Sequence, residues 1–339
     1  MGATGQAAVT PQRIMQFAWG YAPPLAMAAA VEHGLFDLLD GGPKTAAEAA
    51  SLAAISVRGA RHIMDVLTGL GLLTKDADRR YALAPDSAAF LVSTKPGYIG
   101  GPLRHIVSEL VPRWLQLPDI VRTGKPARAV NQEKAGTEFF HGFVESIFPM
   151  SYPAAQRLAA VLELAGATRP VHVLDLAAGS GVWGIAMAQA SPLAQVTAVD
   201  WPGMLDVTRK MTDRFGVTAR FTFVGGDLKD ADFGADHDLA ILGHILHSEG
   251  ELRSRELLKK TARALAPGGT IAIQEFLVDE QRASDVGGLI FGVNMLVNTD
   301  EGDTFSFHEI AGWLTEAGFR NARLVDAPGP SPLILATRG

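Results

Sequence analysis

The chain has 339 residues, more than one ordinary hydrophobic core holds, so two domains are expected. A hydrophobic content of 47% and a charged content of 19% are those of a globular chain rather than a disordered one. The net charge of −6 argues against a general nucleic-acid-binding protein, and the lack of cysteine excludes disulfides, cysteine zinc sites and thiol nucleophiles.

The first segment with a clear pattern runs from Ile14 to Val31 and carries no charge. An apolar stretch of this length near the start of a chain could be a signal peptide or a membrane span. Pro23 and Pro24 interrupt it, and proline breaks a helix. We therefore predict two short apolar helices that meet at the Pro-Pro pair, no membrane segment, and a cytoplasmic location.

The next segment alternates helical patterns with turn residues. Thr45 and Glu48 form a capping box that opens a short helix, directly after the breaker cluster Asp40 to Pro43. Three helices followed by a hairpin are typical of a winged-helix domain. Helices are predicted over 25–39 and 57–70, with a short helix between them that begins at 45. Strands are predicted over 72–75 and 80–83.

A winged helix raises the alternative of a DNA-binding regulator. Between Leu25 and Gly100 the chain has seven basic and eight acidic residues, and the would-be recognition helix presents only Arg58, Arg61 and His62. This is a poor surface for phosphates. We predict a dimerisation module instead, because the apolar segment around Phe17, Trp19 and Leu25 needs a partner surface.

A helical connector is predicted over 97–150, broken at four prolines, and a further helix over 151–165. Aromatic residues crowd the end of the connector. Such a cluster either packs in the core or forms an apolar wall for an aromatic ligand, and both readings stay open. The prolines are Pro102, Pro112, Pro118 and Pro126, and the cluster is Phe139, Phe140, Phe143, Phe148 and Met150.

A strand, a glycine loop, a helix and a second strand follow from Val171 to Asp200. We predict strands over 171–176 and 195–199 and a helix over 182–190. Glycines let the backbone turn sharply beside a ligand, and ligands of open α/β sheets bind beyond the carboxyl ends of the strands. Asp200, at such an end, can accept hydrogen bonds from both hydroxyls of a ribose.

Gly179, Gly181 and Gly184 satisfy the GxGxxG pattern of NAD-binding proteins, but this match alone is weak. Asp175 precedes the glycines, where a carboxylate suits a cationic amine better than a pyrophosphate. A further strand over 221–224 leads to Asp227 and Leu228, which can bond an adenine amino group and pack on its ring. These segments resemble class I S-adenosylmethionine-dependent methyltransferases.

The remaining chain completes an α/β domain. A second capping box, Ser306 with Glu309, opens the last helix. The count of strands fits a Rossmann-like sheet of seven. The other predicted strands are 238–242, 270–274, 323–326 and 333–337, and the other predicted helices are 251–265 and an apolar segment over 289–297.

The whole layout resembles small-molecule O-methyltransferases with an N-terminal winged-helix dimerisation domain, as in plant phenolic and bacterial polyketide methyltransferases. The resemblance implies a homodimer, a dimerisation domain over 1–100, a connector over 101–165 that contributes to the substrate pocket, and a cofactor domain over 166–339. It implies S-adenosyl-L-methionine as cofactor, S-adenosyl-L-homocysteine as product and no metal. The residues implied in cofactor binding are Asp175, Gly179, Gly181, Asp200, Trp201, Asp227, Leu228 and Gly243.

In that family a Leu-His pair at a strand end begins the substrate site, and Leu246-His247 matches it. The resemblance implies that His247 is the general base on a hydroxyl of a small aromatic or polyketide-like acceptor. Phenols have a pKa of about 10, and an imidazole near 6.5 can accept their proton at neutral pH. Two acidic residues normally assist this base. Glu275 matches the first, whereas the second position falls on Gly302, flanked by Glu301 and Asp303; Glu301 is the candidate, and Asp303 or no second acid stay open.

Two positions depart from the family pattern, since Ser248-Glu249 replaces Asp-Trp and Gly243 replaces a frequent lysine. Transfer to carbon or nitrogen, or a repurposed cofactor binder, therefore stays an alternative. His244 could compete as base, and His247 could merely cap a strand end. The predicted substrate pocket consists of Phe143, Met150, His244, Phe291, Asn294, Met295 and Asn298. At several of these positions, packing in the core is the alternative.

Overall fold

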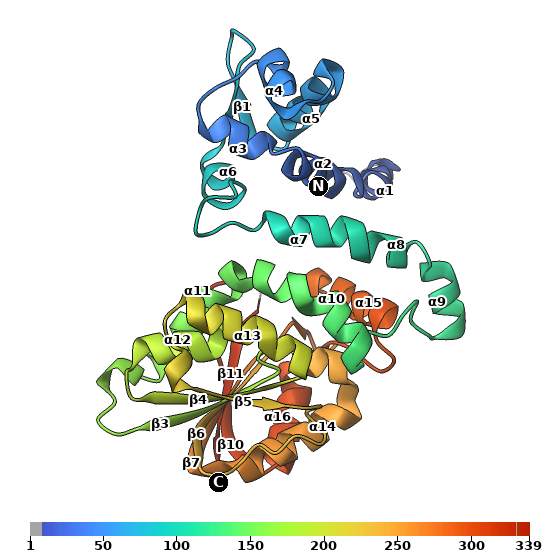
Figure 1. Cartoon of the computed structure of the whole chain (residues 1–339). Helices are drawn as coiled ribbons and strands as arrows, with labels where there is room; N and C mark the ends of the chain where they lie inside the picture. Colours follow the sequence, from blue (N-terminus) through green and yellow to red (C-terminus); the bar gives the residue numbers. More distant parts are fainter. Residues whose placement is uncertain (1–8, 330) are drawn as a thin grey trace, which may run out of the picture. The chain divides into compact units, whose positions relative to one another are not determined.

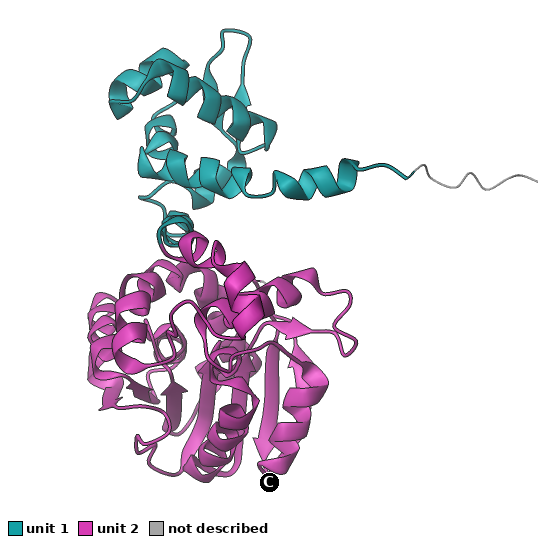
Figure 2. Cartoon of the chain, turned by 90° about the vertical axis from the view of Figure 1, so that its right-hand side faces the viewer, with its two compact units in different colours: residues 1–108 teal, residues 109–339 magenta. Residues whose placement is uncertain are grey.

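The computed structural model describes residues 9–329 and 331–339. The chain forms two compact units, Met1–Ser108 and Glu109–Gly339 (Figure 1, Figure 2). Each unit has a hydrophobic core of its own. The finer division at residues 100 and 165 stays a prediction. Of the helices in the described ranges, none is both long and apolar enough to cross a membrane.

The first unit is mostly helical and carries one antiparallel hairpin, β1 with β2, as predicted. Helix α5 turns Ala60, Met64 and Leu67 into the core, where the ring of Tyr81 from β2 is also buried. The capping box of Thr45 and Glu48 is present. Its elements are α1 (Gln12–Ala18), α2 (Ala22–Glu32), α3 (Leu35–Asp40), α4 (Ala46–Ala53), α5 (Val57–Gly69), β1 (Leu73–Lys75), β2 (Tyr81–Leu83), α6 (Pro85–Phe90) and α7 (Gly100–His105).

The single helix predicted over 25–39 is wrong, because the structure divides it into α2 and α3. Gly34 between them has φ +64°, a left-handed conformation that ends a helix and that glycine adopts without strain. The Pro-Pro pair lies in the first turn of α2 rather than between two helices. The missing N–H of proline costs nothing there.

The connector is also less broken than predicted. Pro112 and Pro118 lie in the first turns of their helices, and only Pro126 falls outside the helices. A π-helical turn, η1 (Ile106–Leu110), follows α7 and leads directly into α8. The helices that follow are α8 (Val111–Trp114), α9 (Leu117–Thr123), α10 (Glu133–Ser146), α11 (Phe148–Val161) and the 3-10 turn η2 (Leu164–Gly166).

Seven strands of the described ranges form the central sheet, in the order β10-β11-β7-β6-β3-β4-β5. The strands from β7 to β5 are parallel, and β11 joins them antiparallel to both β7 and β10. This confirms the predicted seven-stranded α/β sheet with a closing antiparallel pair. The strands are β3 (Val171–Leu176), β4 (Ala194–Asp200), β5 (Phe221–Gly225), β6 (His237–Gly243), β7 (Leu265–Gln274), β10 (Phe319–Val325) and β11 (Leu333–Arg338).

Helices cover both faces of this sheet (Figure 1). Successive residues of a strand point to opposite faces, so Val173 packs with α11, α12 and α13, whereas Leu174 packs with α14 and α16. Both faces are therefore apolar, as a parallel sheet requires. The remaining elements are α12 (Val182–Ala190), α13 (Pro202–Arg214), η3 (Thr218–Arg220), α14 (Leu246–Ala264), β8 (Leu277–Val278), α15 (Val286–Asn298), β9 (Phe305–Ser306) and α16 (Phe307–Glu316).

Helix α14 begins earlier than predicted. The expected start was Glu251, but the first turn begins at Leu246, and Gly250 interrupts the helix with φ +73° and ψ 173°. His247 therefore lies on a helical turn directly beyond β6 rather than in a loop. The interruption turns the chain, so that the main part of α14 packs on the sheet while the first turn stays at the strand ends.

Candidate active site

The loop between β3 and α12 turns through left-handed conformations at Gly179 (φ +55°) and Gly181 (φ +71°). Both residues occupy the place that the sequence assigned to a ligand-binding turn. Behind the loop, Asp175 is 0% exposed, and its Oδ2 accepts the N–H of Gly184 in the first turn of α12 at 2.9 Å. Its Oδ1 has no partner among the described residues. Burial raises the pKa of Asp175 to about 7.

This placement differs from the expectation that Asp175 faces a cationic ligand, because the surrounding structure covers both carboxylate oxygens. The carboxylate instead holds the start of α12, where helical N–H groups have no partner within the helix. Asp175 therefore positions the glycine loop from below.

Asp200 lies at the end of β4 and joins two loops. Its Oδ2 accepts the N–H of Gly179 at 2.8 Å and its Oδ1 accepts the N–H of Trp201 at 2.7 Å. Each oxygen keeps a lone pair for a further donor. Burial raises the pKa of Asp200 to about 6, against these two hydrogen bonds.

Asp227 follows β5, the neighbouring strand. Its Oδ1 accepts hydrogen bonds from the N–H of Lys229 and from Arg253, whereas Oδ2 has no partner among the described residues. The adjacent Leu228 is buried. A free carboxylate oxygen beside an apolar side chain fits the amino group and ring of an adenine.

Gly243, at the end of β6, faces the ring of Trp183 from α12. A Cβ at position 243 would lie 2.0 Å from Nε1 of Trp183, whose side chain is only 4% exposed. No larger residue fits there while Trp183 keeps its place. The lysine that the family often has at this position is therefore excluded by a neighbouring ring.

His247 and Glu275 form a buried pair at the ends of β6 and β7. Nδ1 of His247 lies 2.6 Å from Oε1 of Glu275, and the backbone N–H of His247 donates to Oε2 at 3.2 Å. Burial alone would raise the pKa of Glu275, but the charge and hydrogen bond of His247, together with His244 and the N–H of Phe276, outweigh it and the pKa is lowered. Nε2 of His247 has no hydrogen-bond partner in the described ranges and is not sealed from solvent.

The predicted second acid, Glu301, is not part of this pair. Its side chain is exposed and makes no hydrogen bond to His247. Asp303 lies 3.7 Å from Arg282, and its backbone N–H donates to the carbonyl of His247 at 2.9 Å. At Gly302 a Cβ would lie 2.5 Å from that carbonyl oxygen, so the position leaves no room for an acidic side chain.

Aromatic rings surround the imidazole of His247. Phe291 from α15 lies edge-on to it at a centroid distance of 4.9 Å, and Phe276 lies 4.1 Å from Phe291. His244 lies 4.9 Å from Phe276 and 6.3 Å from His247. Two imidazoles and two phenyl rings thus gather at the ends of β6 and β7. Phe276 was missed from the sequence, although it directly follows Glu275.

The other predicted pocket residues stay predictions, and several of them have partners of their own. Asn294 accepts the indole N–H of Trp114 at 3.0 Å, and Asn298 accepts from Arg113 at 3.2 Å, so both asparagines tie α15 to α8. Met295 and Asn298 are buried. Met150 on α11 is 41% exposed, and Phe143 belongs to the row of rings on α10. Of the predicted residues on α15, Phe291 places its ring against the imidazole of His247.

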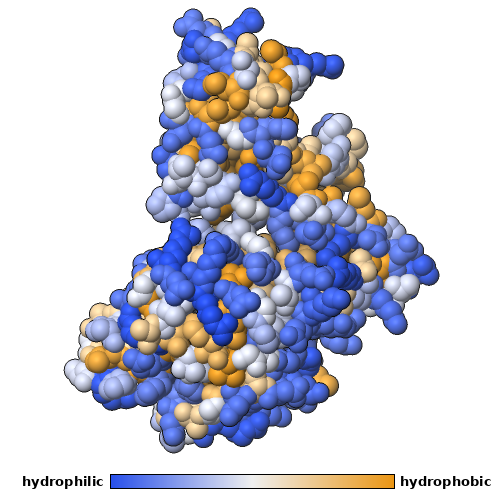
Figure 3. All heavy atoms as spheres, viewed as in Figure 1, coloured by the Kyte–Doolittle hydropathy of each residue, from blue (hydrophilic) through white to orange (hydrophobic). Residues whose placement is uncertain are grey.

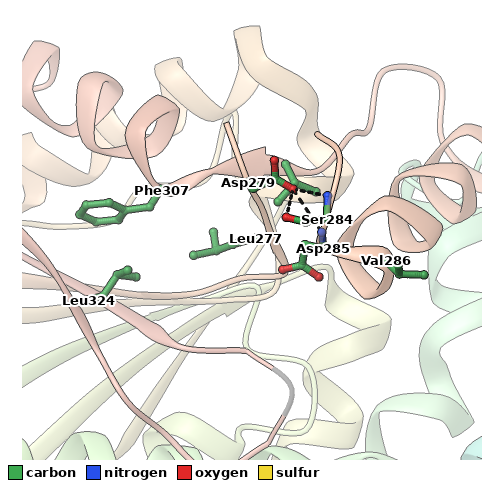
Figure 4. A pocket seen from close by; sticks show the side chains of 8 residues that line it. Leu277, Asp279, Ser284, Asp285, Val286, Phe307 and Leu324 are labelled. Atoms are coloured by element: carbon green, nitrogen blue, oxygen red, sulfur yellow. Dashed lines mark hydrogen bonds between the residues drawn. The ribbon is translucent and has the colours of Figure 1, made fainter. Parts of the chain in front are cut away.

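A separate open hollow of about 560 Å³ lies beside β8 (Figure 4). Leu277, Phe307 and Leu324 form its apolar side. Asp279 accepts several backbone N–H groups, chiefly that of Ser284, and these hydrogen bonds lower its pKa. This carboxylate shapes the loop before α15. Within residues 9–329 and 331–339, no group of three or more His, Asp or Glu side chains could hold a metal ion.

A seven-stranded Rossmann-like sheet with a glycine loop after β3, an aspartate at the end of β4 that accepts an N–H of this loop and a histidine–glutamate pair at its strand ends is the arrangement of one class, the class I methyltransferases. A family model described as an O-methyltransferase domain matches residues 114–320, and an O-methyltransferase dimerisation domain matches residues 15–93. The chain belongs to this family of S-adenosylmethionine-dependent O-methyltransferases.

Three relatives illustrate the similarity. The tetracenomycin polyketide synthesis 8-O-methyl transferase TcmO of Streptomyces glaucescens is 31% identical over 335 residues, which cover 97% of each chain. The 3-hydroxy-5-methyl-1-naphthoate 3-O-methyltransferase of Streptomyces sahachiroi is 32% identical over 330 residues, covering 94% of this chain and 92% of the relative. The solved structure of PigF with SAH, a Serratia protein, has a TM-score of 0.82 at 26% identity and covers 97% of this chain and 100% of its own.

Proposed function

We propose that this enzyme transfers the methyl group of S-adenosylmethionine to a hydroxyl of a small aromatic, polyketide-like molecule, with His247 as general base. The observation that carries the proposal is the pair of His247 and Glu275, which orients a free Nε2 among the rings of Phe276 and Phe291. These rings suit a flat aromatic acceptor.

The residues at the strand ends fit the cofactor. Asp200 keeps lone pairs for the two ribose hydroxyls, and the free Oδ2 of Asp227 can accept the adenine amino group. The turn at Gly179 and Gly181 brings backbone close to the methionine part. When bound, the cofactor supplies an electrophilic methyl group on a sulfonium. Asp175 supports the loop from behind rather than touching the ligand.

The chemistry of the base follows from its hydrogen bonds. A neutral imidazole that donates its Nδ1–H to Glu275 carries its lone pair on Nε2. Nε2 can then accept the proton of a phenol as the oxygen attacks. The buried carboxylate of Glu275 stabilises the imidazolium that forms and keeps the ring in one orientation. Much of the remaining acceleration comes from aligning the two reactants.

The names of two relatives support an aromatic acceptor, because TcmO acts in tetracenomycin polyketide synthesis and the Streptomyces sahachiroi enzyme acts on a hydroxynaphthoate. Transfer to nitrogen is the alternative, since an N,N-dimethyltransferase is also among the relatives. Carbon transfer and a repurposed cofactor binder share the fold as well. Oxygen transfer is favoured because the carboxylate of Glu275 fixes an imidazole where a hydroxyl must lose its proton, whereas a neutral amine can attack without a base and a repurposed binder needs none.

We also propose a homodimer. The dimerisation-domain match begins at residue 15 within α1, and apolar side chains at and just after the end of this helix are exposed, with Phe17 at 77% and Trp19 at 63%. Apolar surface of this kind is present on both units (Figure 3). Large exposed apolar groups on one short helix need a covering partner. Light scattering at micromolar concentration should give twice the monomer mass, and a monomer would contradict the proposal.

The function is tested in two steps. Calorimetry should first show binding of S-adenosylhomocysteine that Asp200→Ala weakens strongly. Methyl-labelled S-adenosylmethionine is then offered with a panel of phenols, naphthols and amines. Label on phenolic oxygen supports the proposal. Label only on amines or carbon would contradict oxygen transfer, and retention of duplex DNA at physiological salt would favour the regulator.

A further inference from the structure

We propose that His244 selects acceptors that carry a second oxygen on the carbon beside, or peri to, the hydroxyl that is methylated. The inference rests on the proposed function and names its acceptor class, which is ortho- or peri-dioxygenated phenols. It follows from how His244 is held, where its ring lies and which atom it leaves free.

His244 is fixed by the neighbouring strands. Its backbone N–H donates to the carbonyl of Gln274 at 2.8 Å, and its Nε2 lies 3.1 Å from Oγ of Ser331. The side chain of Gln274 in turn donates to the carbonyl of Ser331 at 3.0 Å. Both Gln274 and Ser331 are buried. The imidazole therefore has one orientation rather than several rotamers.

The backbone of His244 is also in an uncommon conformation, with φ +59°. Residues other than glycine adopt this left-handed region at a cost and rarely. A glycine at position 244 would avoid the cost of this backbone conformation. The strained residue lies beside the base, with its ring centroid 6.3 Å from that of His247, and strained backbone of this kind gathers at functional sites.

The ring of His244 shares a wall with the base. Both imidazoles lie against the ring of Phe276. The distance between ring centroids is 4.9 Å for His244 and 6.2 Å for His247. Nδ1 of His244 has no hydrogen-bond partner among the described residues, and it is not sealed from solvent. The ring centroids of His244 and His247 lie 6.3 Å apart, so a flat acceptor whose hydroxyl meets Nε2 of His247 would lie next to a second imidazole with a free nitrogen.

The charge state of His244 suits binding rather than proton transfer. Burial lowers the pKa of His244 to about 4, against the pull of the Glu275 carboxylate. Its ring is therefore neutral at working pH and adds no positive charge beside a sulfonium. A base this weak is poorly matched to a phenol with a pKa of about 10. What remains is a neutral hydrogen-bonding group one ring away from the base.

The test measures binding of two phenols to the enzyme saturated with S-adenosylhomocysteine, so that no turnover is needed. The phenols are 1-naphthol and 1,8-dihydroxynaphthalene, which differ by one peri oxygen, and 8-hydroxy-1-tetralone replaces that hydroxyl with a carbonyl. We expect at least one of the two dioxygenated compounds to bind about tenfold more tightly than 1-naphthol, the effect of one good hydrogen bond. The preferred one reports whether Nδ1 accepts or donates.

Two variants distinguish the effect of the polar nitrogen of His244 from the effect of the volume of its ring. His244→Gly removes the imidazole and tolerates the left-handed backbone. His244→Asn tolerates it as well and keeps an amide near the place of Nδ1. We expect the preference to vanish in H244G and to persist in part in H244N. The affinity for S-adenosylhomocysteine and the Tm of each variant show whether it is folded.

The inference is overturned if the wild-type enzyme binds all three phenols equally, if none binds, or if H244G keeps the preference. Failure of the proposed function would give a different experimental result. In that case the preference for two oxygens is present and lost in H244G, but no methyl group is transferred to any phenolic oxygen.

Discussion

Glu275 holds His247 at two points, since one carboxylate oxygen lies 2.6 Å from the ring Nδ1 and the other accepts the backbone N–H of the same residue. One fully buried carboxylate therefore sets both the position and the tautomer of the imidazole. Among the described residues no second acidic side chain makes a hydrogen bond to His247, and the carbonyl of His247 occupies the space beside Gly302.

Glu275→Gln should lower kcat by roughly 10²-fold, the scale of general acid–base catalysis. The amide can still accept from Nδ1–H, but it carries no charge to stabilise an imidazolium. Affinity for S-adenosylhomocysteine, measured by calorimetry, serves as the control and should stay within about threefold, because the cofactor residues lie on other strands. Full activity of E275Q would mean that the carboxylate is structural.

Asp200 should make cofactor binding depend on pH. Its carboxylate must be ionised to accept two ribose hydroxyls, and burial raises its pKa to about 6. As pH falls from 8 to 5 the ionised fraction drops, so the Kd for S-adenosylhomocysteine should rise about tenfold. Asp200→Asn should bind weakly at both pH values with no such slope. A wild-type Kd that does not change between pH 8 and 5 would contradict this role.

Asp175 should make the free energy of unfolding depend on pH. The direction is opposite to that of a paired carboxylate, because the pKa of Asp175 is raised by folding rather than lowered. Its pKa in the folded state, about 7, lies above the value near 3.9 of an unfolded aspartate. The contribution of Asp175 to the free energy of unfolding is therefore greatest below pH 4, falls as pH rises to about 7 and stays low above it. Asp175→Asn removes this loss, so its stability relative to wild type should increase by roughly 2 kcal/mol from pH 5 to pH 8.

Urea unfolding at the two pH values measures this difference. A relative stability of D175N that does not change with pH would show that the buried carboxyl keeps its ordinary pKa. The same variant is a control for Asp200, since it should retain the dependence of cofactor affinity on pH.

The contact of Gly243 with Trp183 predicts a steric effect. Gly243→Ala should lower the free energy of unfolding by about 1–3 kcal/mol, because its Cβ would lie 2.0 Å from the indole nitrogen. Trp183→Leu should remove much of this penalty in the double variant. Gly312→Ala is the matched control, since nothing lies within 4 Å of a Cβ there. Equal stability of G243A and G312A would contradict the packing described.

Much of the site could be predicted because its pattern is local. A buried strand followed by a polar residue places Asp200, Asp227 and His247 at one edge of the sheet, whichever helices pack around it. Glu275 follows from the same rule on β7. Phe276 could have been included, since it is next to Glu275 at the end of that strand.

Other features depend on residues that are far apart in the chain. The periodicity of α15 correctly put Asn294 and Asn298 on one face, but only the packing of α8 shows that this face meets Trp114 and Arg113. Likewise, a motif assigns a ligand role to Asp175, and only the closed loop above it reveals its burial. A helical or strand pattern says which residues share a face, not what covers that face.

The central claim is that Nε2 of His247 accepts the acceptor's proton. The most direct measurement is the single-turnover rate of methyl transfer to a preferred phenol by His247→Ala, with the enzyme saturated by S-adenosylmethionine. We predict a rate lower by roughly 10²-fold or more, the scale of a general base, with an unchanged Kd for S-adenosylhomocysteine. A variant that transfers the methyl group at nearly the wild-type rate, or one that loses the cofactor instead, would contradict the account.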